Sequence, residues 1–248
     1  MAAGKNKLLR FCRLYVGGYD LSGDSREIGT LKNSMGEVDL TGWGQDGNYI
    51  ADMARAVGLT GYQALFNDLA GGSFSRLAAQ SSQVLTLAIG GGAAPAVGDM
   101  AYLLPAVQMS SPVDFSNSVA VLSADFNLDA SQVSANYGNP FGVVLLPLTA
   151  LSNTTTGTAV DVGTGAAGWI AQLHVTVSSG GTWAFIIQYS ATGVFGGEET
   201  TLGTFALTGS AVGAEFLSGT ADVDGYVRFK ATKTSGTCTV FCALARNQ

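Results

Sequence analysis

The second half of the chain contains short segments in which apolar residues occupy every other position. Alternation with a period of two places one set of side chains on one face of an extended strand. It occurs in 169–177 (WIAQLHVTV), with Trp169, Ala171, Leu173, Val175 and Val177 on one face, and in 183–190 (WAFIIQYS), with Trp183, Phe185, Ile187 and Tyr189 on one face. Similar segments follow at 201–209, 226–234 and 238–245. This spacing predicts an all-β sandwich over 169–248.

The first half has a mixed pattern. Strands are expected at 7–16, 36–41, 84–90, 100–109 and 119–128. Segment 49–57 (YIADMARAV) instead places Ile50, Met53, Ala54 and Val57 on one face of a helix, and 62–69 suggests a second helical turn. We therefore predict a mainly β protein with an α+β domain at 1–150 containing one main helix. The polar, glycine-rich segment 151–168 is expected to be a linker to the sandwich at 169–248.

Charge is low and unevenly distributed. Only 12% of the 248 residues are charged, the net charge is −6, and no lysine or arginine lies between Arg76 and Arg228. A basic surface can dock on an acidic one, and an acidic surface repels polyanions. This asymmetry favours contacts between copies of the chain. A soluble acidic protein with a surface of Ser, Thr, Gly and Asn explains the composition equally well.

The sequence shows no pattern typical of a targeting signal, a transmembrane helix or a disulfide framework. It has no apolar run of the length that a transmembrane helix needs, and the basic start MAAGKNKLLRF lacks the apolar region of a signal peptide. We expect no membrane partner. Of three cysteines, Cys238 and Cys242 alternate with Val240 and Leu244 and are expected to be buried free thiols, consistent with assembly in a reducing cytoplasm.

No catalytic constellation is found in the sequence. His174 is the only histidine, and it is expected to be a polar residue that faces outward from its strand. The adjacent Glu198 and Glu199 are interpreted as solvated residues or as part of a subunit contact. No phosphate loop or metal-ligand spacing occurs. We therefore expect no enzyme activity, no cofactor, no metal and no small-molecule ligand.

Three segments of the first half resemble the major tail (tube) proteins of long-tailed bacteriophages: LYVGGYDLSGD at 14–24, EVDLT at 37–41 and the region around YIADMARAV. In the second half, 168–193 and 225–240 resemble the β-sandwich appendage of phage structural proteins. The resemblance implies hexameric rings stacked into a tube that conducts DNA. The implied partners are the protein itself, other tail proteins and DNA in transient, non-specific passage. The implied location is the virion tail, after assembly in the host cytoplasm.

Candidate site residues follow from charge and from this resemblance. Subunit contacts are predicted at Lys5, Lys7, Arg10, Arg13 and Trp43, and lumen-facing carboxylates at Asp99, Asp114, Asp125 and Asp129. Two other functions stay open: a capsid decoration (head-stabilising) protein, and a carbohydrate-binding tail-tip module. In the second of these, Trp43, Trp169 or Trp183 would stack on sugars, although Trp169 and Trp183 fit a hydrophobic core better.

Overall fold

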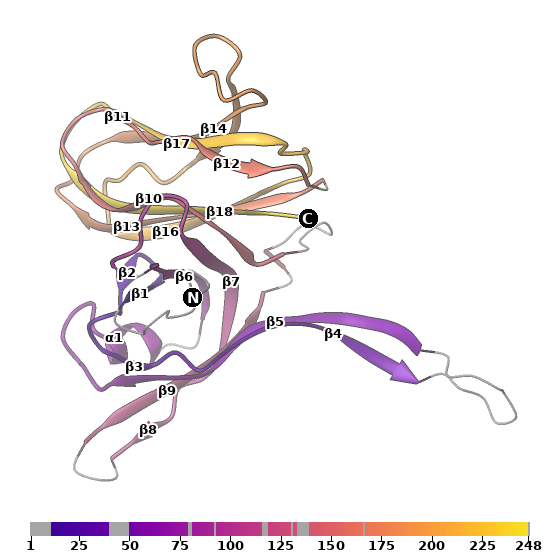
Figure 1. Ribbon diagram of the computed structural model, residues 1–248. Helices are drawn as coiled ribbons and strands as arrows, with labels where there is room; N and C mark the ends of the chain where they lie inside the picture. Colours follow the sequence, from indigo (N-terminus) through magenta and orange to yellow (C-terminus); the bar gives the residue numbers. More distant parts are fainter. Residues whose placement is uncertain are drawn as a thin grey trace, which may run out of the picture.

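The computed structural model describes residues 11–39, 50–78, 81–91, 93–115, 119–129, 131–132, 139–165 and 167–247. Most of them lie in strands of two antiparallel sheets (Figure 1). The elements are β1 (Cys12–Val16), β2 (Tyr19–Asp20), β3 (Ser25–Glu27), β4 (Thr30–Asp39), β5 (Ile50–Leu65), α1 (Ser73–Leu77), β6 (Ser82–Ile89), β7 (Met100–Ser110), β8 (Val113–Asp114), β9 (Val121–Leu128), β10 (Phe141–Leu151), β11 (Thr155–Thr156), β12 (Val160–Gly163), β13 (Trp169–Ser178), β14 (Trp183–Ser190), β15 (Thr200–Phe205), β16 (Gly213–Gly219), β17 (Gly225–Lys233) and β18 (Cys238–Arg246).

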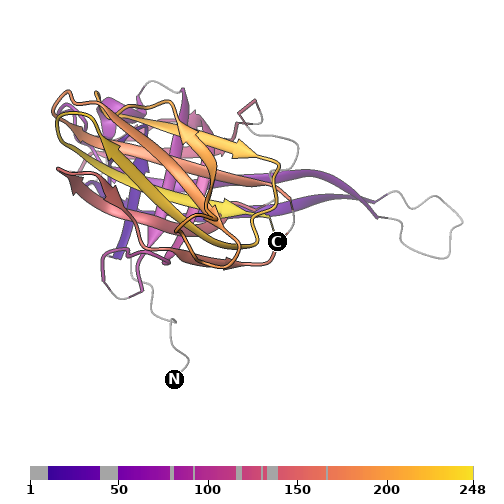
Figure 2. The same ribbon diagram turned by 90° about the horizontal axis from the view of Figure 1, so that it is seen from above.

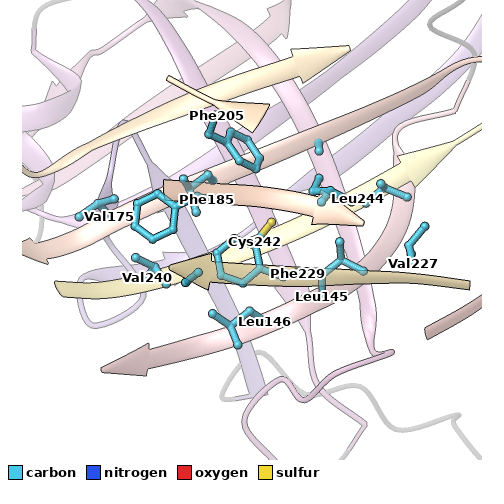
Figure 3. Close-up of a cluster of buried hydrophobic side chains, with 14 of the residues drawn as sticks. Leu145, Leu146, Val175, Phe185, Phe205, Val227, Phe229, Val240, Cys242 and Leu244 are labelled. Carbon is cyan, nitrogen blue, oxygen red and sulfur yellow. The ribbon is translucent and has the colours of Figure 1, made fainter. Parts of the chain in front are cut away.

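The predicted sandwich is present. One layer is a five-stranded sheet with the order β11-β17-β14-β15 and with β12 beside β17. The other layer is one end of a thirteen-stranded sheet, and this end consists of β16, β13, β18 and β10. Their inner faces share one hydrophobic cluster, in which Phe185, Phe229 and Cys242 lie close together (Figure 3). Trp169 and Trp183 belong to this cluster, at 6% and 2% exposure, as the alternating pattern predicted. Cys238 and Cys242 are buried free thiols, which confirms that prediction.

The large sheet does not end at the sandwich. It continues from β10 to β7, β6, β1 and β2, and β9 branches from β7 to carry β5, β4, β3 and β8. These strands and α1 enclose a second cluster that includes Leu59, Tyr62, Tyr102 and Phe126. We call this part the N-terminal body; it lies below the sandwich in Figure 1.

Segment 151–168, expected to be a linker, is partly built into the sandwich. Its strands β11 and β12 pair with β17, with Thr156 opposite Lys230 and Val160 opposite Val227. Strand β10 crosses the expected boundary at residue 150. It pairs with β18 along most of its length and with β7 at Phe141–Val143, so it belongs to both parts of the large sheet. A division of the chain into two domains at this boundary stays a prediction.

The mainly β fold is confirmed, but the helix predicted over 49–57 is wrong. Within the described residues this stretch belongs to β5, and backbone pairing with β4 runs from Thr30 opposite Thr60 to Asp39 opposite Ile50. The second predicted helical turn, at 62–69, begins in the same strand. A partner strand outside the segment decides the conformation here, and periodicity within one segment does not register that partner. The helix of the described residues is α1, Ser73–Leu77.

Candidate interaction surfaces

The most prominent feature of the structure is a β-hairpin that projects from the N-terminal body (Figures 1 and 2). It consists of β4 and the first half of β5. Strand β9 pairs with one edge of β5 only at residues 58–65, and β3 follows β4 along the other edge at Gln63 and Ala64. Residues 50–57 therefore have β4 as their one partner among the described strands. Strand β4 pairs only with β5 in this part of the chain. No described strand pairs with either long edge of the projecting hairpin, so another strand can pair there.

A groove lies on the outer face of β3, β5, β8 and β9. Its volume is about 490 Å³, and its lining combines Leu65, Val119 and Val121 with Arg26, Gln63, Asp114 and Ser123. Phe115, which follows β8, is 72% exposed, and its ring centroid lies 6.2 Å from that of Phe66. We call Leu65, Phe115 and Val119 the β8–β9 patch. Exposed apolar side chains beside a groove are where we look for a contact surface.

Most of the predicted subunit-contact residues, Lys5, Lys7, Arg10 and Trp43, lie outside the described residues. Arg13 is described and lies in β1. Its side chain is half-buried, and its Nη1 donates to the carbonyl oxygen of Cys12 at 3.0 Å. A contact between copies through Arg13 stays a prediction.

Two of the four predicted lumen carboxylates lie near the surface. Asp114 is exposed in β8 and lines the groove. Asp99 precedes β7 in a turn, where its Oδ2 accepts from the backbone N–H of Ala96 at 2.9 Å. Of the two, Asp114 is the more exposed.

The other two carboxylates hold backbone in place. Asp125 Oδ1 accepts from the N–H of Gly61 at 2.7 Å. Asp129 is 7% exposed and accepts from the Ser82 hydroxyl at 2.8 Å and from the Ser131 hydroxyl at 2.6 Å. The Ser131 hydroxyl is the main cause of the lowered pKa of Asp129. Strand β9 ends before Asp129, so the two aspartates do not share a face of this strand.

His174 is not an outward-facing residue, contrary to the sequence prediction. It has 0% exposure because β13 is covered on both faces. One face carries Trp169, Leu173 and Val175 into the sandwich core, while Ile170 on the other face joins a cluster with Tyr15 and Phe241. A covering layer from the N-terminal body is a tertiary contact that the alternation of one strand cannot reveal.

Glu198 and Glu199 stabilise the loop between β14 and β15, which projects from the sandwich (Figure 1). The Glu198 carboxylate accepts from the hydroxyls of Ser190 and Thr192, and these bonds lower its pKa. Glu199 lies 4.0 Å from Arg228, whose guanidinium carbon lies 4.1 Å from the centre of the Phe195 ring. Sequence reasoning did not identify Phe195 or Arg228, because neither belongs to a recognisable motif.

The described residues contain no group of three or more His, Cys, Asp or Glu side chains placed to hold a metal ion. No helix in this part of the chain is long and apolar enough to cross a membrane. The candidate sites described here are surfaces: the open-edged hairpin, the apolar patch beside the groove, and the loop between β14 and β15 on the sandwich.

No protein-family model and no curated protein matches the sequence. Among solved structures, the chain is similar to the SPP1 Dit (gp 19.1) protein, described as a paradigm of the hub adsorption apparatus in phages that infect Gram-positive bacteria. The identity is 14%, and the match covers 94% of this chain and 99% of that one, with a TM-score of 0.34. Values this low do not define the fold or the function of the chain.

Proposed function

We propose that this protein is a structural subunit of a bacteriophage tail and that it assembles with its own copies into a ring. The open-edged hairpin of β4 and β5 carries the proposal. The β8–β9 patch supplies an apolar surface on the same body, and the resemblance of segments 14–24 and 37–41 to tail tube proteins supplies the context. The role is non-enzymatic.

An unpaired strand edge presents a row of N–H and C=O groups that another strand can satisfy. A projecting hairpin offers such groups away from the body, so it reaches a neighbouring copy more easily than an edge that lies flat against the core. When each copy contributes a hairpin to the next, a head-to-tail contact repeats until the rotation closes. A closed ring leaves no edge exposed.

In its most specific form, the proposal is a major tail tube protein whose hexameric rings stack and conduct DNA. Among the four predicted lumen carboxylates, Asp114 is the one whose exposure best suits contact with the channel. A lumen rich in carboxylates and free of lysine would keep phosphates from binding. Virions carrying Asp114→Lys should assemble intact tails but eject DNA more slowly, most clearly at low salt. Normal ejection at low salt would remove Asp114 from the channel.

The ring contact is tested by shortening the hairpin. Asn33 and Val57 are directly paired, so replacing residues 34–56 with an Asn-Gly turn should close the hairpin next to the body and leave Thr30–Asn33 and Val57–Leu65 in place. Negative-stain microscopy and native mass spectrometry should show rings for the wild type and monomers for the variant. Matching circular dichroism spectra control for folding. Rings that persist in a folded variant would contradict the proposal.

The same images separate the other functions. Stacked rings support a tube, single rings support a hub or tip position, and trimers bound to a shell support decoration. The carbohydrate-binding alternative is weaker, because Trp169 and Trp183 are buried and only Trp43, which lies outside the described residues, is left to stack on a sugar.

A further inference from the structure

The large sheet folds back so that its two ends meet. Its strand order runs β16-β13-β18-β10-β7-β6-β1-β2, and the turn between β1 and β2 reaches β13 and β16. In that turn, the backbone N–H of Gly18 donates to Nδ1 of His174 at 3.3 Å. A Cβ at Gly18 would lie 2.4 Å from the carbonyl oxygen of Gly213, so this approach requires glycine. We call this meeting of β1–β2 with β13 and β16 the seam.

Three polar side chains are fully buried at the seam. Thr86 of β6 and Gln172 and His174 of β13 all have 0% exposure. The Thr86 hydroxyl lies 2.8 Å from Nε2 of His174 and donates to Oε1 of Gln172. We call Gly18, Thr86, Gln172 and His174 the seam cluster. It links β1–β2 and β6 of the N-terminal body to β13 of the sandwich.

The hydrogen bonds of the seam cluster define the tautomer of His174 and require its ring to be neutral. Because Nδ1 accepts from Gly18, the ring proton of a neutral His174 lies on Nε2. Nε2–H then donates to the Thr86 oxygen, while the Thr86 hydroxyl donates onward to Gln172. The bond from Gly18 needs His174 to be neutral, because a second proton on Nδ1 would point at the Gly18 N–H and place two donors against each other.

The surroundings keep the ring neutral. Burial lowers the pKa of His174 to about 3. The titratable group that faces it is Tyr15, whose ring centroid lies 5.5 Å away and whose pKa is raised mainly by burial, so this phenol is also neutral. Asp20 and Arg13 act electrostatically on Tyr15, in opposite directions. The third ring in contact with the cluster is Phe241, 6.3 Å from His174.

We propose that the seam cluster is an acid-sensitive closure that holds the N-terminal body and the sandwich together, and that protonation of His174 opens it. In the closed state the two parts move as one unit. In the open state the Gly17–Gly18 turn leaves β13, the imidazolium reaches water, and the sandwich is tied to the body by β10 and β7 at their corner.

The direction of the pH effect follows from linkage. The pKa of His174 in the closed state, about 3, lies below the ordinary value of 6.5. The open state therefore binds more protons between these values, and the closure is strongest above pH 6.5 and weakens as the pH falls toward 3. One proton per opening changes the opening equilibrium by up to about tenfold per pH unit in this window.

Hydrogen–deuterium exchange on the full-length protein tests the closure between pH 7 and pH 4, with rates corrected for intrinsic exchange. Protection of the peptide that contains Gly17–Asp20, and of β13, should fall by up to about tenfold per pH unit. The β17–β18 turn at Thr234–Thr237 serves as an internal control and should show no such slope. The variant His174→Gln, which cannot be protonated, should lack the slope in the seam peptides.

Two results would overturn the proposal: seam protection that does not change with pH in the wild type, or an equal slope in His174→Gln. If His174→Gln does not fold, the wild-type series and Thr86→Val decide. Thr86→Val removes a hydroxyl but leaves the histidine, so it should lower seam protection at pH 7 and retain the pH slope. Loss of the slope in Thr86→Val would assign the titration to a group other than His174. None of these readouts requires ring formation, so failure here is distinct from failure of the proposed assembly.

Discussion

Strands β13 and β5 belong to the same sheet but differ in how their neighbours complete them. β13 is paired on both edges, by β16 and β18, and is covered on both faces. β5 is paired on both edges only from residue 58 onward, with β9 on one side and β4 and then β3 on the other, and its Leu59 and Tyr62 are buried. Residues 50–57 extend beyond the body with one partner strand. One strand is thus complete within a single chain, and the other is completed only over half its length.

The difference bears on function as well as on stability. A strand that is satisfied on all sides contributes to folding and has nothing left to offer a partner. A strand left open along one edge keeps its hydrogen-bonding groups available, and natural proteins usually protect such edges unless they are used. The comparison therefore separates the part of the sheet that holds the molecule together from the part that we propose joins copies.

The largest expected effect comes from matched core truncations in the two strands. Leu173→Ala in β13 and Leu59→Ala in β5 each remove a side chain with 0% exposure, and each should lower the free energy of unfolding by about 2 to 5 kcal/mol. Urea unfolding followed by circular dichroism measures both. Because the seam joins the two parts, we expect one shared transition at neutral pH. Two transitions, each moved by only one of the variants, would show that the sandwich and the body unfold independently.

The sequence predicted strands from their own apolar patterns and failed where the conformation depends on a partner strand outside the segment. Alternation correctly placed Trp183, Phe185 and Ile187 in the core, and the strands expected at 84–90 and 100–109 are present. It did not predict β16, whose residues are nearly all half-buried, or β10, which carries Pro147. In β5 the apolar residues also fit a helical period, and only pairing with β4 excludes the helix.

The candidate surfaces were less predictable than the fold. Charge asymmetry suggested contacts between copies, but nothing in the sequence marks a free strand edge, because an edge is defined by strands that are missing beside it. Asp114 and Asp129 looked alike as isolated carboxylates, yet one is exposed and the other is buried among hydroxyl donors. The burial of His174 likewise depends on the fold-back of the whole sheet.

A second, smaller effect compares these two aspartates. Asp129→Ala leaves the Ser82 and Ser131 donors without their acceptor and should cost about 2 to 3 kcal/mol, whereas Asp114→Ala should change the free energy of unfolding by less than about 0.5 kcal/mol. The lowered pKa of Asp129 means that its contribution is present above the ordinary value of 3.8 and is lost as the pH falls below it. Urea midpoints at pH 7 and pH 3 measure both effects. Equal losses for the two variants would contradict the assigned role of Asp129.

The smallest effect tests how far along β13 the closed environment reaches. Val175 and Val177 occupy the same face in a regular strand, but Val175 has 0% exposure and Val177 has 58%. The pairing of β13 with β18 shifts register between them, opposite Val240 and Thr239, and Val175 belongs to the sandwich core whereas Val177 does not. Val175→Thr should therefore cost about 1 to 2 kcal/mol, because it buries a hydroxyl, while Val177→Thr should stay within about 0.5 kcal/mol of the wild type. The two substitutions are chemically identical, so the difference between their urea midpoints measures the environment alone. A Val177→Thr loss as large as that of Val175→Thr would mean that another surface covers Val177 in solution and that β13, like β5, offers a contact at its end.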